Sequence, residues 1–278
     1  MVYGVLRLIN FAHGEVYMVG AFIGFYSAHW LGFVDSGNEI SLMHSLLLIP
    51  IAMVGCVMLG LLIERVAYRP LRRSPRLTSL ITAIGVSLFL QHMGQIVFGT
   101  DPKAFPRLPA DEQMPISAGS VVVPREDILI FVVAILLMIT LQFVVQRTKV
   151  GKAMRAVSFD RETASLMGIS VDKIIVVTFI LGSAFAGAAG VLAGIKYHQL
   201  QPLMGLYVGL KAFVAAVLGG IGNIPGAMVG GMLMGIAEVM VVGYLDSSLR
   251  DAIVFGILIM ILVFRPTGLF GKGSVEKA

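Results

Sequence analysis

The chain has 278 residues, of which 57% are hydrophobic and 13% charged, and its mean hydropathy is +0.91. These values exclude an ordinary soluble domain and predict an integral membrane protein. The net charge of +5 does not indicate nucleic-acid binding, because the basic residues cluster in loops that flank apolar runs. The single cysteine, Cys56, rules out an intramolecular disulfide, and the sequence has no spacing typical of a metal site.

Apolar windows predict an all-α, polytopic membrane protein with about eight transmembrane or part-spanning helices. In chain order the windows cover residues 13–34, 43–66, 77–98, 127–146, 174–197, 205–221, 225–244 and 249–264. The loops between them are short enough that we expect one membrane domain over the whole chain.

The opening segment, INFAHGEVYMVGAFIG, places polar residues in an apolar context. Asn10, His13 and Glu15 are costly in lipid and therefore mark a candidate substrate pathway, together with Gly14. The alternative is structural: these side chains cap a helix or hold an irregular turn together by hydrogen bonds.

Charge predicts the topology of the next loops. The segment ERVAYRPLRRSPR holds five arginines and should lie in the cytoplasm, because basic residues that flank spans are retained there. The connection 99–126 carries more acidic than basic residues and should lie outside. Two spans, 77–98 and 127–146, join the arginine loop to a second basic segment, 146–173, so both basic segments should lie in the cytoplasm.

Residues 146–173 form a long polar segment with six basic and three acidic residues. Asp160 suits a helix N-cap, Glu162 lies in the first turn where the helix dipole favours a carboxylate, and Gly168 suits the C′ position. The pattern predicts a helix of about two turns, too short to be stable alone. Such a helix is typical of a segment that another protein binds. The predicted docking face is small and apolar and consists of Ala153, Ala156, Val157, Ala164 and Met167. The alternative is a solvated basic loop that only fixes topology.

Small residues recur every four positions in the window 174–197: Gly182, Ala186, Gly190 and Gly194. This spacing places them on one helix face and permits close approach by a neighbouring backbone. We expect the neighbour to belong to this chain rather than to a partner subunit.

The segment KAFVAAVLGGIGNIPGAMVGGMLMG, residues 211–235, should break a helix, because its glycines and Pro225 interrupt the hydrogen-bonded ladder. Backbone N–H groups at such a break can receive a carboxylate. The second set of pathway candidates is Gly220, Gly222, Asn223 and Gly226. Both interrupted segments lead from an Asn through a Gly into a helix rich in small residues, which suggests an inverted repeat.

Lys211 and Glu238 are charged residues that lie at similar depth in adjacent predicted spans. We expect them to form an intramembrane ion pair or to share a water-filled vestibule. The alternative is that each reaches the membrane interface separately.

Four strings carry a resemblance to a known family: VYGVLRLINFAHGEVYMVGA, ERVAYRPLRRSPRL, SLMGISVDKIIVVTFILGSAFAGAAGVL and KAFVAAVLGGIGNIPGAMVGG. They resemble the permeases of high-affinity branched-chain amino acid ABC transporters, most closely the shorter of the two permease subunits. Glu162-Thr163-Ala164-x-x-x-Gly168 resembles the EAA–x3–G motif of ABC importer permeases, with Thr in place of the usual Ala. In that family the motif forms a coupling helix that docks on the ATPase.

The resemblance implies a permease domain, not an enzyme, in the bacterial inner membrane, with 146–173 as its coupling loop. It implies a second homologous permease, two ATP-binding subunits that use ATP and Mg, and a periplasmic amino acid-binding protein; this chain would bind no cofactor or metal. The residues expected to act in ATPase coupling are Gly151, Arg155, Asp160, Arg161, Glu162, Ala164 and Gly168. Because the family's first span begins earlier than MVYG, we expect that span to be truncated.

Two alternatives stay open. One is a permease of the same architecture that carries urea or short amides. The other is a secondary transporter driven by an ion gradient, with Glu15 or Glu238 as a proton site. The polar segment argues against the second, since an ion-driven carrier needs no helix that docks on an ATPase. The chain has no P-loop and therefore no usual apparatus for hydrolysing ATP itself.

Overall fold

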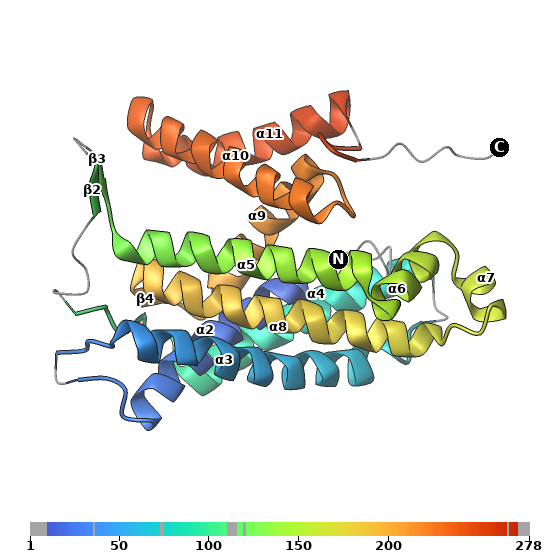
Figure 1. The fold of residues 1–278 in the computed structure, drawn as a ribbon, viewed down its shortest axis with the longest axis horizontal. Helices are drawn as coiled ribbons and strands as arrows, with labels where there is room; N and C mark the ends of the chain where they lie inside the picture. Colours follow the sequence, from blue (N-terminus) through green and yellow to red (C-terminus); the bar gives the residue numbers. More distant parts are fainter. Residues whose placement is uncertain are drawn as a thin grey trace.

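The computed structural model describes residues 10–35, 37–72, 75–109, 116–118, 121–265 and 267–271, and they form a helical bundle (Figure 1). The α-helices are α2 (Ala12–Trp30), α3 (Leu42–Ile63), α4 (Arg76–Phe98), α5 (Arg125–Arg147), α6 (Lys149–Phe159), α7 (Arg161–Leu166), α8 (Val171–Tyr197), α9 (Met204–Gly219), α10 (Ile224–Tyr244) and α11 (Arg250–Phe264). A π-helical turn, η1 (Glu64–Tyr68), continues α3, and a 3-10 turn, η2 (Ser247–Leu249), precedes α11.

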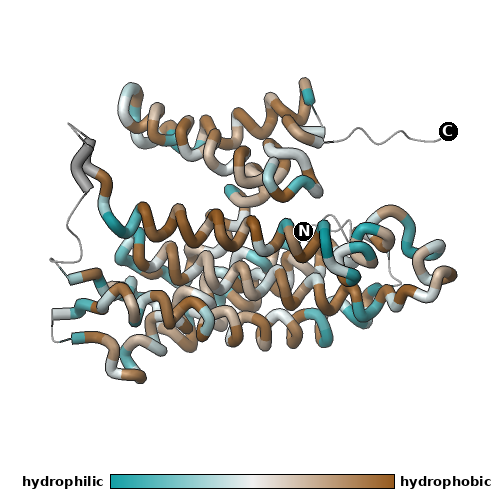
Figure 2. The backbone as a smooth tube through the Cα atoms, in the orientation of Figure 1, coloured by the Kyte–Doolittle hydropathy of each residue, from teal (hydrophilic) through white to brown (hydrophobic). Residues whose placement is uncertain are grey.

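Each of the eight predicted windows coincides with a helix, so the all-α polytopic fold class is confirmed. Six of the helical segments are long and apolar enough to cross a membrane. The remaining two are α9, which has only 16 residues, and α2, which carries the polar residues of the opening segment. Hydrophobic residues run along the helices, and hydrophilic residues gather at the helix ends (Figure 2). The expected truncation of a first span concerns residues outside the described ranges.

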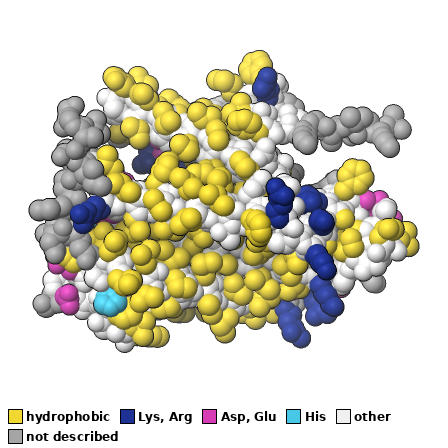
Figure 3. Space-filling model, in the orientation of Figure 1, with side chains coloured by type: hydrophobic (Ala, Val, Ile, Leu, Met, Phe, Trp, Pro, Cys, Tyr) yellow, Lys and Arg dark blue, Asp and Glu magenta, His cyan; other side chains and the backbone are white. Residues whose placement is uncertain are grey.

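The two basic loops lie at the same end of the bundle, as their charges predicted (Figure 1). We call this end, formed by residues 64–72 and 147–170, the basic end. Most of the Lys and Arg side chains visible in Figure 3 gather there. The opposite end holds two short antiparallel pairings, β1 (Lys103–Ala104) with β4 (Gln199–Leu200) and β2 (Ile116–Ala118) with β3 (Val121–Val123).

Helix α8 lies at the centre of the bundle and packs against α2 and α3. Its glycines allow the contact: a Cβ added at Gly190 would lie 2.3 Å from the carbonyl oxygen of Tyr17, and one at Gly187 would lie 2.7 Å from that of Ala52. The prediction that the small residues of this helix pack within the chain is therefore confirmed for Gly190. At these glycines no side chain separates the backbone of α8 from those of α2 and α3, so the backbones lie in direct contact.

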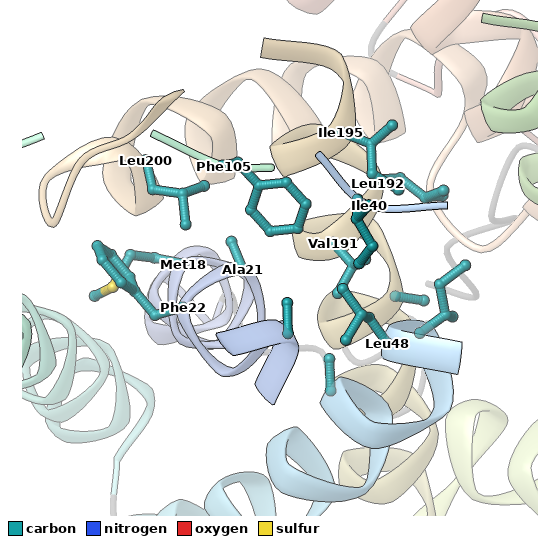
Figure 4. Close-up of a cluster of buried hydrophobic side chains, with 14 residues drawn as sticks. Met18, Ala21, Phe22, Ile40, Leu48, Phe105, Val191, Leu192, Ile195 and Leu200 are labelled. Atoms are coloured by element: carbon teal, nitrogen blue, oxygen red, sulfur yellow. The ribbon is translucent and has the colours of Figure 1, made fainter. Parts of the chain in front are cut away.

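A core of buried apolar side chains lies toward the end opposite the basic end, where the connection after α4 folds back into the bundle (Figure 4). Phe105 is fully buried between Val191 of α8 and Phe22 of α2. A Cβ at Gly194 would lie 2.7 Å from the Phe105 ring, so this glycine makes room for the aromatic side chain. The sequence placed residues 99–126 outside the membrane but gave no sign that Phe105 is a core residue.

The outer helices expose their apolar side chains. Helix α5 has no buried residue in this chain, and α4, α10 and α11 present many exposed Leu, Ile, Val, Met and Phe side chains. Such faces require lipid or another membrane subunit, because water would make them costly to expose.

Replacing Gly190 by Ala should destabilise the protein by about 1–3 kcal/mol, because the new methyl group overpacks the contact between α8 and α2. Gly235→Ala on α10 is the matched control, since nothing lies within 4 Å of its Cβ position. Unfolding of the purified protein in detergent, followed by circular dichroism, measures both. Equal midpoints for the two variants would contradict the close contact.

Candidate functional site

A cavity of about 390 Å³ opens between α2, α8 and α9. Its walls are mostly apolar and include Phe185, Leu206 and Phe213, while Asn10 and His13 supply polar groups. We call it the α2 cavity. An apolar pocket of this size with few polar groups is typical of a small-molecule site.

Asn10 and Gly14 have structural contacts as well as places on the α2 cavity. The Tyr68 hydroxyl donates a hydrogen bond to Asn10 Oδ1 at 2.8 Å, which ties the start of α2 to η1. A Cβ at Gly14 would lie 2.3 Å from the carbonyl oxygen of Gly205, so this glycine lets α9 approach α2. His13 lines the cavity beside them.

Glu15 differs from its neighbours, because it does not line the α2 cavity. Its side chain is fully buried, and the Ser87 hydroxyl of α4 donates to Oε1 at 3.3 Å. Oε2 has no hydrogen-bond partner among the described residues and lies against Gly205. The structure therefore separates Glu15 from the pathway group in which the sequence placed it.

The second set of pathway candidates lies at the turn between α9 and α10. Gly220, Gly222 and Asn223 line a cavity of about 240 Å³ together with Arg155 of α6, which places this turn at the basic end. Asn223 Oδ1 accepts from the N–H of Gly226 at 3.0 Å and caps α10. The helix break that the sequence predicted within residues 211–235 is therefore the capped turn between the end of α9 and the start of α10.

The structure does not bring the two candidate sets into one pocket. They lie on separate cavities whose walls share Phe213. Asn10 and Asn223 also differ, because Asn223 caps its helix whereas α2 has no side-chain cap. An inverted repeat stays a prediction.

Lys211 and Glu238 lie in contact, with Lys211 Nζ 3.1 Å from Glu238 Oε1. They belong to a larger network that the sequence did not reveal. Lys211 also contacts Asp251 at 2.8 Å, and Arg250 contacts Glu238 Oε2 at 2.5 Å. Two cations and two carboxylates thus join α9, α10 and the start of α11. The depth match between Lys211 and Glu238 was visible in sequence; the return of α11 beside them was not.

The polar segment contains two helices where the sequence predicted one. The missed helix, α6, begins at Thr148, whose Oγ1 accepts from the N–H of Gly151 at 3.0 Å. Helix α7 begins as predicted: Asp160 Oδ1 accepts from the N–H groups of Glu162 at 2.9 Å and Thr163 at 3.2 Å. It ends before Gly168, whose φ of +81° is left-handed.

Most of the apolar face predicted for docking packs inside the chain, so the prediction is wrong for Val157 and Ala164, whereas Met167 is exposed. Val157 and Ala164 are buried with Met154 and Ile174 in a small core under α6, α7 and α8. Gly151 is also buried, since a Cβ there would lie 2.2 Å from the carbonyl oxygen of Val145.

Three apolar side chains at the ends of α6 and α7 are exposed to the surroundings. Leu166 is 88% and Met167 79% exposed, and Phe159 at the end of α6 is 87% exposed. We call these three residues the apolar tip. Glu162 is exposed beside them, Arg161 is half-buried, and Arg155 donates to the carbonyl of Val145.

At the opposite end, His198 follows α8 in a left-handed conformation with φ of 53°. Its Nε2 lies 3.8 Å from Glu126 Oε2. Burial lowers the pKa of His198 below its ordinary value, although the Glu126 carboxylate opposes this. The imidazole is therefore neutral near pH 7, and this contact is not a standing ion pair. Across the described ranges, no three His, Cys, Asp or Glu side chains are grouped to hold a metal.

The fold and its site define a class: a polytopic, all-helical membrane permease with a small cavity between its spans and short helices projecting from one end. Residues 1–263 match the family model described as branched-chain amino acid transport system, permease component. The chain belongs to this family.

Relatives of known name agree with the family match. The chain is 43% identical, over all of its length and 90% of the relative, to the high-affinity branched-chain amino acid transport system permease protein BraD of Pseudomonas aeruginosa. It is 41% identical, with the same coverage, to the corresponding permease LivH of Escherichia coli K12. It is 28% identical, over 52% of its length and 43% of the relative, to the guanosine ABC transporter permease NupP of Bacillus subtilis. No solved structure matches the chain.

The charge network predicts unequal effects for its two carboxylates. Glu238→Gln should cost about 1–3 kcal/mol of stability, because it removes the nearly buried carboxylate that Lys211 and the half-exposed Arg250 share. Asp251→Asn should cost about 1 kcal/mol or less, because that side chain is 56% exposed. Denaturant unfolding in detergent compares them.

The exchange Lys211→Glu with Glu238→Lys should not restore stability, since it sets the new Glu against Asp251 and the new Lys against Arg250. Rescue by this exchange would show that the pair acts alone and that the network does not.

Proposed function

We propose that this chain is the permease subunit of an ATP-binding-cassette importer that carries leucine, isoleucine and valine across the bacterial inner membrane. The observation that carries the proposal is the 43% identity to BraD over the whole chain. The α2 cavity supports it independently, because its size and apolar walls suit a small molecule with an aliphatic side chain.

The cavity suggests how the substrate passes. A branched-chain amino acid has a hydrophobic end and a zwitterionic end. Phe185, Leu206 and Phe213 would contact the side chain, while Asn10 and His13 would hydrogen-bond the polar end. Few polar groups are an advantage here, since a transporter must release what it binds.

The energy for import would come from partner subunits. Two ATPases would use ATP and Mg at the basic end, which basic residues assign to the cytoplasm. Helix α7 would be the coupling helix, with the apolar tip seated in an ATPase groove and Glu162 and Arg161 at its rim. Buried Ala164 would instead anchor α7 to α8, so that the two move together.

The remaining partners follow from the exposed surfaces. A second homologous permease would cover part of the apolar face that α5 and its neighbours expose, and lipid the rest. A periplasmic amino acid-binding protein would deliver the substrate at the opposite end.

The test is uptake by proteoliposomes that contain this chain together with a second permease, two ATPases and an amino acid-binding protein from the same organism. We expect ATP-dependent accumulation of labelled leucine that unlabelled isoleucine and valine inhibit and urea does not. Ala189→Phe, in the α2 cavity, should reduce uptake about tenfold or more because it fills the pathway. Ala134→Phe on the exposed face of α5 is the matched control. Inhibition by urea or acetamide instead, or uptake without ATP, would contradict the proposal.

Gly168 provides a test of the coupling helix. Nothing lies within 4 Å of its Cβ position, so a substitution acts through the left-handed backbone alone. Gly168→Val should lower uptake per ATP hydrolysed, whereas Gly168→Asn should retain most of it, because Asn tolerates this conformation. Equal coupling ratios in the two variants would mean that the end of α7 does not transmit force.

A further inference from the structure

Arg72 joins the two loops of the basic end. Its guanidinium forms ion pairs with Glu64 on one side and Asp172 on the other. Glu64 opens the π-helical turn η1, and Asp172 lies in the first turn of α8, four residues after Gly168. Arg72 is therefore a bridge between the segment that follows α7 and the end of α3.

The bridge is mostly buried. The exposed fraction of the side chain is 16% for Arg72 and 4% for Glu64, while that of Asp172 is 70%. Arg72 Nε has no hydrogen-bond partner among the described residues. The guanidinium thus gives up much of its hydration, and the two carboxylates compensate for that loss.

The segment that Arg72 holds is not an ordinary helix end. In η1 the N–H of Arg69 donates to the carbonyl of Glu64 at 2.7 Å, a bond five residues long. π-helical turns are rare and are frequently found at functional sites.

The π-turn leads directly to the α2 cavity. Its last residue, Tyr68, is buried, packs its ring against Phe179 of α8 with centroids 5.2 Å apart, and donates to Asn10 Oδ1 at 2.8 Å. Asn10 lines the cavity. Ion pairs therefore join Asp172 and Glu64 through Arg72, the backbone of η1 joins Glu64 to Tyr68, and a hydrogen bond joins Tyr68 to Asn10.

We propose that Arg72 is a positioning residue that transmits movement of the coupling helix to the α2 cavity. When α7 moves, the start of α8 moves with it, and Asp172 pulls the guanidinium. Glu64 then shifts within η1, and Tyr68 carries the change to Asn10 at the cavity wall. This inference rests on the proposed function, since it names the residues by which ATP hydrolysis would act on the pathway.

Asp172→Asn is the sharpest test, because structure and coupling predict different outcomes. Asp172 is exposed, so losing its charge should leave the unfolding midpoint in detergent almost unchanged. The relay requires that uptake of leucine per ATP hydrolysed fall at least about fivefold, the lower range of measured coupling between sites. Arg72→Gln should uncouple at least as strongly, and Lys173→Gln, exposed at the next position, is the matched control.

A second readout follows the cavity itself. With Ala189→Cys, the rate of thiol labelling should differ between the nucleotide-free transporter and one trapped with ATP and vanadate. Buried Cys56 alone gives the background. Asp172→Asn and Arg72→Gln should abolish this difference, and Lys173→Gln should keep it.

The outcomes separate the two proposals. If the unsubstituted complex shows no ATP-dependent leucine uptake, the proposed function fails. If that complex transports, and both Asp172→Asn and Arg72→Gln keep its coupling ratio and its labelling difference, Arg72 is only a structural anchor and the relay is overturned. Loss of folded protein in Arg72→Gln alone leaves the test to Asp172→Asn.

Discussion

The close backbone contact of α8 with α2 and α3 is the constraint on which the other features depend. Gly190 meets the carbonyl of Tyr17 and Gly187 meets that of Ala52, so three backbones are held at contact distance. In a membrane such packing supplies attraction that the hydrophobic effect does not. The contact sets the spacing between the helices that bear the α2 cavity, because α2 supplies Asn10 and α8 supplies Ala189. It also carries the start of α8 out to the basic end beside α7.

Among the described residues, two ion-pair networks contain a nearly buried glutamate, and each joins separate helices. Lys211 and Glu238 tie α9 and α10 to α11, whereas Arg72 ties the end of α3 to the start of α8. Ion pairs of this kind add little stability over apolar residues but are costly to break from one side. Because one partner is costly to remove, such ion pairs suit helices that must move together. The first network would keep three helices together, and the second would link the ATPase side to the pathway.

Much of the fold was predictable because a lipid bilayer constrains the length and polarity of the helices that cross it. Apolar windows located the eight helices, and charge placed the two basic loops at one end, since crossing length and charge retention depend on composition alone. Capping chemistry is equally local, so Asp160 and Gly168 marked the ends of α7 correctly. Helix α6 was missed because its stability comes from tertiary packing. The face of Val157 and Ala164 was read as a docking surface for the same reason, since a small apolar stripe does not say which chain covers it.

The sequence by itself determined the class of protein, the order of its eight long apolar helices and the position of a short capped helix. Each of these depends on residues close together in the chain or on their average polarity. Only the tertiary structure decided that Glu15 is buried away from the cavity, that Phe105 enters the core, and that Asp251 joins Lys211. It alone brought Arg72 between Glu64 and Asp172. Those contacts join residues up to a hundred positions apart, and no local pattern encodes which helix faces which.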